Sequence, residues 1–366
     1  MRELQDIFTT SLYSQLFDEA LANECISACP GIQGKLVKES RKNSDYWYWL
    51  GRNNDGVVKR IYIGSDTQKT RDTVKYITDR HDSAAQAIAS MKKTAAAYKA
   101  SGGQQNEPAH FKIIALLAQQ QLFSKGVMIV GSHAFLSICN AMGVSATLKT
   151  MFTTDVDFAR PQSVALAIPD ERKSIADVPV ILKEFDKNFF LVPDLDPRNP
   201  STSLQNNKTK VKVDFLTSLR GQKKPVVFED LGIAAEPLKY MDYLMNGSPL
   251  KGLIVGSYAI PANFPDPARF AVHKLIISQE RAIHHRSKTH KDIYQAEILL
   301  DHFIKEGEAD LIVEALSACA AIEGAFKNIK KSLVELKAIN SGVAEFIDCQ
   351  LMKLKSKATT VNYPRP

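Results

Sequence analysis

The sequence predicts an α+β fold in which a mixed sheet forms the centre of the chain. Between residues 106 and 262, short apolar runs bounded by turn residues alternate with amphipathic segments, which is typical of a sheet packed against helices. From residue 263 onward the pattern is helical, and Pro267 suits the first turn of the opening helix. We therefore expect three regions: an N-terminal helical and β-hairpin region (1–105), a core (106–262) and a C-terminal helical domain (263–366).

Composition limits the class of protein. The 366 residues carry a formal net charge of +7, which suits an enzyme that handles polyanions such as nucleotides or RNA. No apolar run approaches the length of a membrane span, and the N-terminus has no signal-peptide core. Of the five cysteines, Cys25 and Cys29 form the one close pair, without the second pair that a zinc site needs. We expect a cytoplasmic protein without membrane partners.

The stretch from Val127 to Met142 predicts a strand that turns sharply into a helix. Val127 to Val130 is a short apolar run, and an amphipathic segment follows at once and stops at Gly143. Gly131 and Ser132 would lie at the N-terminus of this helix. Free N–H groups and the positive end of the helix dipole make such a turn suitable for phosphate.

Two further runs place acids on strands. Thr154 to Phe158 predicts a strand in which Asp155 and Asp157 point to one face, while the apolar residues between and beyond them point to the core. Asp214 lies in the apolar run Val211 to Leu216, which predicts another strand. Carboxylates that repel one another are relieved by a divalent cation, and Mg²⁺ prefers oxygen ligands.

This order of features resembles the nucleotidyltransferase-fold superfamily, the polymerase-β-like group. Its pattern is Gly-Ser after a strand, Asp-x-Asp on a second strand and a lone Asp on a later one. Trp47 to Gly64 and Pro265 to Leu300 also resemble a bacterial subgroup whose substrates are mostly unassigned. The segment between Ser132 and Asp155 is longer here than in many members.

The resemblance implies a catalytic site with two Mg²⁺ ions. Asp155, Asp157 and Asp214 would be the catalytic residues and metal ligands, and Asp214 would also accept a proton from the attacking hydroxyl. Gly131 and Ser132 would contact the phosphates of the nucleoside triphosphate (NTP) substrate, for example ATP.

A helix expected over residues 268–281 supplies two more nucleotide-binding candidates. In the resembling family a lysine at the place of Lys274 reaches the triphosphate, and Arg281 lies on the same helix face. The alternative is that Lys274 buries its stem for structural reasons. His133 would touch phosphate or base, or else serve packing. The basic run 284–291 is expected to form a loop that contacts phosphate or RNA, or is simply solvated.

Outside the site, the sequence favours three further local structures. Asp45 to Leu50 and Val57 to Ile63 predict a two-stranded hairpin, whose tryptophans either stack on nucleobases or pack the hairpin onto the rest of the protein. Residues 193–208 are expected to form an exposed loop, and residues 239–244 a short strand.

The function favoured by these features is Mg²⁺-dependent transfer of a nucleoside monophosphate (NMP) from an NTP to a hydroxyl of RNA, such as a tRNA end, or of protein, with release of pyrophosphate. The alternative is a non-catalytic nucleotide- or RNA-binding module of the same fold, of the kind found in toxin–antitoxin or defence systems. A third reading is a helical interaction protein whose core senses nucleotide.

Overall fold

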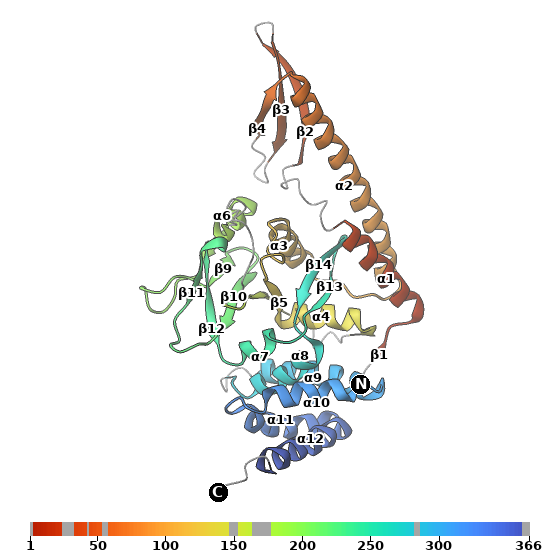
Figure 1. The fold of residues 1–366 in the computed structure, drawn as a ribbon, viewed down its shortest axis with the longest axis vertical. Coiled ribbons are helices and arrows are strands. Elements are labelled where there is room, and N and C mark those ends of the chain that lie inside the picture. Colours follow the sequence, from red (N-terminus) through yellow and green to blue (C-terminus); the bar gives the residue numbers. More distant parts are fainter. Residues whose placement is uncertain are drawn as a thin grey trace.

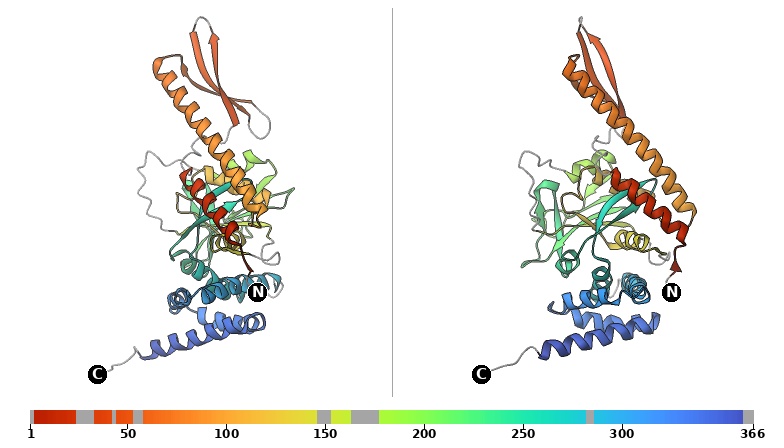
Figure 2. Two further views of the ribbon diagram at one scale, coloured as in Figure 1. Left: turned by 90° about the vertical axis from the view of Figure 1, so that its right-hand side faces the viewer. Right: turned by 45° about the vertical axis from the view of Figure 1, so that its right-hand side comes forward.

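The computed structural model describes residues 3–23, 33–41, 44–52, 58–145, 153–162, 177–281 and 286–360. The molecule is elongated: an arm projects at one end, a mixed sheet lies in the middle, and a stack of helices closes the other end (Figures 1 and 2). The expected α+β class is confirmed. None of the described helices is both long and apolar enough to cross a lipid bilayer.

The central sheet has the strand order β11-β12-β10-β7-β5, and the pair β8-β9 is attached along the first half of β10. Strands β7, β10 and β12 run parallel, while β5, β9 and β11 are antiparallel to their neighbours. The strands are β5 (Met128–Val130), β7 (Asp155–Ala159), β8 (Phe189–Leu191), β9 (Ser203–Asn206), β10 (Lys212–Ser218), β11 (Val226–Phe228) and β12 (Ile233–Leu238).

Alternation along β7 and β10 decides which side chains enter the core. Val156, Phe158, Val213 and Phe215 are buried on one face, and the two phenylalanine rings stack with centroids 5.4 Å apart. The polar residues between them must therefore point to the other face. Burial of the apolar residues on one face of each strand therefore directs the acidic residues of the same strand to the opposite face.

Helices and a hairpin surround the sheet. Asp177 caps the N-terminus of α6 by accepting a hydrogen bond from the Val180 N–H (3.0 Å), as its position before an apolar run predicts. The remaining elements of this region are β1 (Glu3–Leu4), which pairs with β6 (Val144–Ser145), α3 (Pro108–Gln119), α4 (Gly131–Ala141), α6 (Val178–Phe185), α7 (Met241–Met245), β13 (Leu250–Val255) and β14 (Ala259–Phe264).

The C-terminal helices form layers below the sheet (Figure 1). Asp266 caps the first of them by accepting from the Arg269 N–H (2.8 Å), and Pro267 occupies its first turn as predicted. The helices are α8 (Pro267–Ser278), α9 (Arg286–Lys305), α10 (Ala309–Cys319), α11 (Ala325–Ile339) and α12 (Ser341–Thr360).

The arm is built on one long helix. Helix α2 (Gln68–Ala100) packs its C-terminal third against α1 (Ile7–Ala22) and carries a three-stranded sheet at its other end (Figures 1 and 2). That sheet consists of β2 (Gln33–Arg41), β3 (Ser44–Arg52) and β4 (Val58–Ser65), all antiparallel. The prediction of a two-stranded hairpin was therefore wrong by one strand, because β2 alternates mostly polar residues and lacks an apolar signal. The expected turn 53–56 and the pair Cys25 and Cys29 lie outside the described residues.

Three other local expectations were wrong. The segment expected as a loop over 193–208 contains β9, because β10 supplies a strand edge with which it pairs. The segment 239–244 forms helix α7 after Tyr240, whose φ is +65°, rather than a strand. The basic run is not a loop from Arg286 onward, because those residues form the first turns of α9, while residues 282–285 lie outside the described ranges.

Candidate active site

The three predicted acids lie on one face of two neighbouring strands. Strands β7 and β10 are parallel, and their register pairs Lys212 with Asp155 and Asp214 with Asp157. Residues paired across a sheet point to the same side, so Asp214 shares the face of Asp155 and Asp157. The side chains of Asp155 and Asp214 are 28% and 14% exposed, so the acids line an accessible surface rather than the core.

The predicted Gly-Ser turn is brought directly against these acids. Strand β5 pairs with β7 so that Val130 is opposite Asp157, and Gly131 follows as the first residue of α4. Gly131 has a φ of +69°, and a Cβ atom placed on it would overlap the Asp157 carboxylate oxygen Oδ2. Glycine is needed here for both reasons. Ser132 is partly exposed in the same first turn of α4.

Burial and the neighbouring acids together disfavour the ionised form of Asp157. Desolvation, followed by the neighbouring charges of Asp214 and Asp155, raises the pKa of Asp157 to about 7. Within the described ranges, no group forms a hydrogen bond or ion pair with the Asp157 carboxylate. Asp157 is therefore a carboxylate whose ionisation a nearby cation would favour strongly.

The other two acids already have partners. Asp214 Oδ1 is 2.8 Å from Lys212 Nζ and accepts a hydrogen bond from the Ser203 hydroxyl. Asp155 Oδ2 lies 3.7 Å from Lys288 Nζ at the start of α9. Sequence reasoning missed both Lys212 and Ser203. Lys212 is two residues before Asp214 on the same strand, so alternation could have found it, whereas Ser203 reaches Asp214 only through the pairing of β9 with β10.

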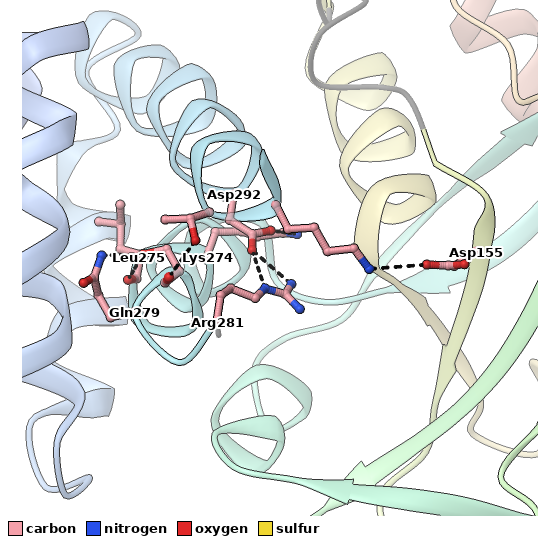
Figure 3. A network of polar contacts seen from close by, with 9 residues as sticks. Asp155, Lys274, Leu275, Gln279, Arg281 and Asp292 are labelled. Atoms are coloured by element: carbon pink, nitrogen blue, oxygen red, sulfur yellow. Dashed lines mark hydrogen bonds and ion pairs between the residues drawn. The ribbon is translucent and has the colours of Figure 1, made fainter. Parts of the chain in front are cut away.

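Lys274 and Arg281 both bind the carboxylate of Asp292. Lys274 Nζ is 2.7 Å from Asp292 Oδ1, and the Arg281 guanidinium is 3.0 and 3.1 Å from Asp292 Oδ2 (Figure 3). The side chains of Lys274 and Asp292 are 6% and 4% exposed. Burial opposes ionisation of Asp292, but the two cations outweigh it and lower its pKa. Lys274 thus joins α8 to α9, whereas Arg281 lies beyond α8, because that helix ends at Ser278 and not at residue 281 as expected.

This cationic side of the site faces the acids. Lys274 and Lys288 both favour the ionised form of Asp157, as opposite charges nearby do. Burial, followed by the charge of Lys274, lowers the pKa of Lys291 to about 8, although Asp292 and Asp157 oppose the shift. Figure 3 shows the ion pairs between the helices and the connection to Asp155 on the sheet. Lys288 and Lys291 occupy the first turns of α9, where cations are disfavoured by the helix dipole unless an anion compensates.

His133, the third residue of α4, is a buried neutral side chain. Its Nδ1 is 2.8 Å from Asn106 Nδ2, and Asn106 Oδ1 accepts from the Val255 N–H, so the asparagine amide must donate to the histidine. Desolvation, then His110, lowers the pKa of His133 to about 3. His110 lies edge-on at 4.9 Å. Among the alternatives left by the sequence, the Asn106 contact favours a packing role for His133.

The donor set suits magnesium, although the acids are not gathered as a finished ligand set. Within the described residues, no three His, Cys, Asp or Glu side chains lie close enough to form a metal centre. Lys212 and Lys288 occupy the places near Asp214 and Asp155 that a cation would take. Three carboxylates on one face, one with a pKa raised to about 7, nevertheless match the oxygen ligands that Mg²⁺ prefers. The residues therefore fit the ion.

Comparison with known proteins identifies the family of the chain. A family model described as nucleotidyltransferase matches residues 109–320, more than half of the chain, and the match includes every candidate residue from Gly131 to Arg281. It also includes both sides of the site, the sheet acids and the first C-terminal helices. No curated protein and no solved structure matches the chain. The chain belongs to this nucleotidyltransferase family, whose general activity is nucleotidyl transfer from an NTP.

Proposed function

We propose that the protein is a Mg²⁺-dependent nucleotidyltransferase that transfers an NMP from an NTP to a hydroxyl group of RNA or protein. The observation that carries this proposal is the register of β7 and β10, which brings Asp155, Asp157 and Asp214 to one face beside the Gly131 turn. A cation-rich helix pair faces that cluster. Family membership supports the general activity but leaves the acceptor open.

In the proposed reaction, the acceptor oxygen attacks the α-phosphorus and forms a new P–O bond. The bond between the α-phosphorus and the oxygen that bridges to the β-phosphorus breaks, and pyrophosphate leaves. Asp155, Asp157 and Asp214 would hold two Mg²⁺ ions, which when bound neutralise phosphate charge and lower the pKa of the attacking hydroxyl. Asp214 accepts the proton of that hydroxyl, and Ser203 and Lys212 position its carboxylate.

The chain's donors bind the triphosphate. The N-terminus of α4 presents backbone N–H groups next to Asp157, and Ser132 adds a hydroxyl. Lys274 carries three donors, of which Asp292 takes one, so the ammonium retains donors for phosphate while Asp292 orients it. Arg281 shares the same counter-ion and contributes charge. Lys288 and Lys291 add two cations that the sequence alone assigned to a loop.

Pyrophosphate release tests the proposal. The full-length protein is incubated with Mg²⁺, each of the four NTPs and total RNA or cell protein, in parallel with Asp157→Asn and Asp214→Asn. We expect release by the wild type, loss of at least 100-fold in both variants (about 3 kcal/mol of transition-state stabilisation), and no release when the metal is chelated. NTP binding without turnover, unchanged in Asp157→Asn, would instead support a nucleotide sensor.

A further inference from the structure

We propose that the arm formed by β2, β3, β4 and α2 is a binding platform for unpaired RNA, and that it holds the acceptor of the transfer reaction. The RNA-binding part of this inference stands independently, whereas the assignment of that RNA as acceptor rests on the proposed function. Three features of the arm carry it: its charge, its exposed tyrosine face and its position.

The arm carries the net charge of the whole protein. Residues 33–100 contain 14 lysines and arginines against 7 aspartates and glutamates, a net charge of +7. The full chain also has a formal net charge of +7, so the remaining residues sum to zero. A single segment that concentrates the positive charge is the electrostatic pattern of a surface for phosphate backbones.

The two faces of the arm sheet are different. A Cβ placed on Gly64 would meet Thr70 of α2, and Gly64 is paired with Trp47, so the tryptophan face of the sheet lies against the helix. Trp47 Nε1 also donates to Asp66, which forms an ion pair with Arg71 of α2. The packing role that the sequence left as one alternative therefore describes Trp47.

The opposite face presents tyrosines. Tyr46 and Tyr48 alternate with Trp47 along β3 and so point away from α2, and both rings lie against Tyr62 of β4, with centroids 6.3 and 5.5 Å apart. The Arg60 guanidinium stacks on Tyr48 at 3.8 Å. Tyr62 is 55% exposed. Flat aromatic rings beside guanidinium groups form the stacking surface that unpaired bases use without sequence preference.

Basic residues surround these rings. Lys35 and Arg41 of β2 are exposed, and strand alternation places them on the tyrosine face with Arg60. Glu39 on the same face forms ion pairs with Arg41 and Arg60, which leaves that face with a net positive charge. No described side chain of the three strands is buried, so the sheet has its aromatic surface available for a partner. Charge complementarity favours RNA over a protein with an apolar surface as that partner.

The arm projects away from the acids of β7 and β10, so only a macromolecule could contact both. Helix α2 has 33 residues, or about 50 Å at 1.5 Å per residue. Met91, Ala95 and Tyr98 near its C-terminus are buried against the body, while its N-terminal half carries the sheet outward (Figures 1 and 2). An NTP cannot touch both the arm and the acids of β7 and β10. A folded RNA with an unpaired segment is large enough to do so.

RNA binding by the full-length protein, without NTP or metal, tests the platform separately from catalysis. The probe is an unstructured fluorescent oligoribonucleotide, with fluorescence anisotropy as the readout. We expect Tyr62→Ala to weaken binding about tenfold, since each stacked base contributes substantially, and Tyr62→Phe to bind like the wild type. The triple variant Lys35→Gln, Arg41→Gln, Arg60→Gln should reduce the salt dependence, measured as the slope of log K against log salt, by about 2.

A matched control removes the same charge elsewhere. Lys224, Lys331 and Lys353 are exposed on the core and on the C-terminal helices, and their triple replacement by Gln should leave the slope of the wild type unchanged. Equal effects of the two triple variants would overturn the proposal. So would tighter binding of DNA of the same sequence, or a dimer of the wild type that dissociates in Tyr62→Ala, because the tyrosine face would then serve another partner.

Two further measurements keep the inference testable if a variant fails to fold. Ultraviolet cross-linking of RNA to the wild type should map to residues 33–65, and cross-links found only outside the arm would contradict it. In the transfer reaction, the arm triple variant should raise the KM for RNA while leaving the KM for NTP unchanged. RNA binding by the arm without any nucleotidyl transfer would refute the proposed function alone. Transfer to RNA with a KM that the arm variant does not change, or transfer to protein instead of RNA, would refute the assignment of the bound RNA as the acceptor.

Discussion

The backbone of Gly131 lies against the carboxylate of Asp157 so closely that a Cβ atom on the glycine would overlap Oδ2. The contact joins the turn that is proposed to bind phosphate to the acid that is proposed to bind metal. Strands β5 and β7 impose it, because Val130 and Asp157 are paired across them. The first helical turn of α4 and the acidic face of the sheet therefore form one site.

Gly131→Ala should accordingly damage both stability and activity. Alanine is strained at the φ of +69°, and its methyl group would also displace the Asp157 carboxylate. Gly221→Ala is the matched control, because Gly221 has a φ of +76° but nothing within 4 Å of its Cβ position. Both variants should lose about 1 kcal/mol from backbone strain. Urea unfolding should show a larger loss for Gly131→Ala, and equal losses would contradict the contact.

Asp157→Asn should stabilise the metal-free protein at high pH. The pKa of Asp157 is about 7 in the folded protein against an ordinary value of 3.8, so its contribution to stability is fully present below pH 3.8 and is lost as the pH rises through about 7. The variant and the wild type should melt alike only below pH 3.8; from there the advantage of the variant should grow with pH and level off above about pH 7, at on the order of 1–3 kcal/mol.

Thermal melts of both proteins across this pH range measure the difference directly. Taking the difference between variant and wild type removes the effect of buried His133 and His273, whose lowered pKa values make stability fall as the pH drops below 6.5. Added Mg²⁺ should raise the wild-type midpoint at pH 8 more than that of the variant. A difference between the two proteins that does not change with pH would contradict the raised pKa.

Lys274→Met should destabilise the protein by about 3–5 kcal/mol, because it leaves Asp292 buried with one partly exposed partner. Arg281→Met should cost less, since the Arg281 side chain is 35% exposed. The double variant Lys274→Met, Asp292→Leu should recover most of the loss. Equilibrium unfolding of the four proteins checks this, and a Lys274→Met protein as stable as the wild type would show that the ion pair is not structural.

Lys288→Gln should raise the KM for NTP about tenfold with little effect on folding. Lys288 is 53% exposed and lies 3.7 Å from Asp155, where it can pass from the acid to a phosphate group. Lys305→Gln is the control on the same helix, because Lys305 binds Asp301 at the far end of α9. Steady-state kinetics with varied NTP separates the two variants. Equal KM values for both would place Lys288 outside the nucleotide site.

The central part of the fold could be predicted because short sequence patterns indicate the type of each helix or strand. An apolar run before Gly131, strict alternation around Asp155 and Asp157, and a capping Asp177 each state an element type within a few residues. Because β7 and β10 both bury alternate residues, the pattern alone predicted that each acid points away from the core, whereas the pairing of the two strands was expected only from the resemblance to the nucleotidyltransferase fold.

The rest depended on tertiary contacts that no local pattern encodes. Strand β9 forms because β10 offers it an edge, and that pairing delivers Ser203 to Asp214. Lys274 was expected either to reach the triphosphate or to bury its stem, and Asp292, which is 18 residues away in the sequence, holds it in a buried ion pair. Strand β2 carries so many charged residues that it has no apolar face to signal it.

The intact mass of an acceptor RNA after reaction shows directly whether the protein transfers NMP units to RNA. The full-length protein is incubated with Mg²⁺, a mixture of NTPs and total small RNA, beside Asp214→Asn. An RNA should gain the mass of one or more NMP units with the wild type and none with the variant. An NTP that binds the protein at the acids while every RNA and protein keeps its mass would contradict the proposed function.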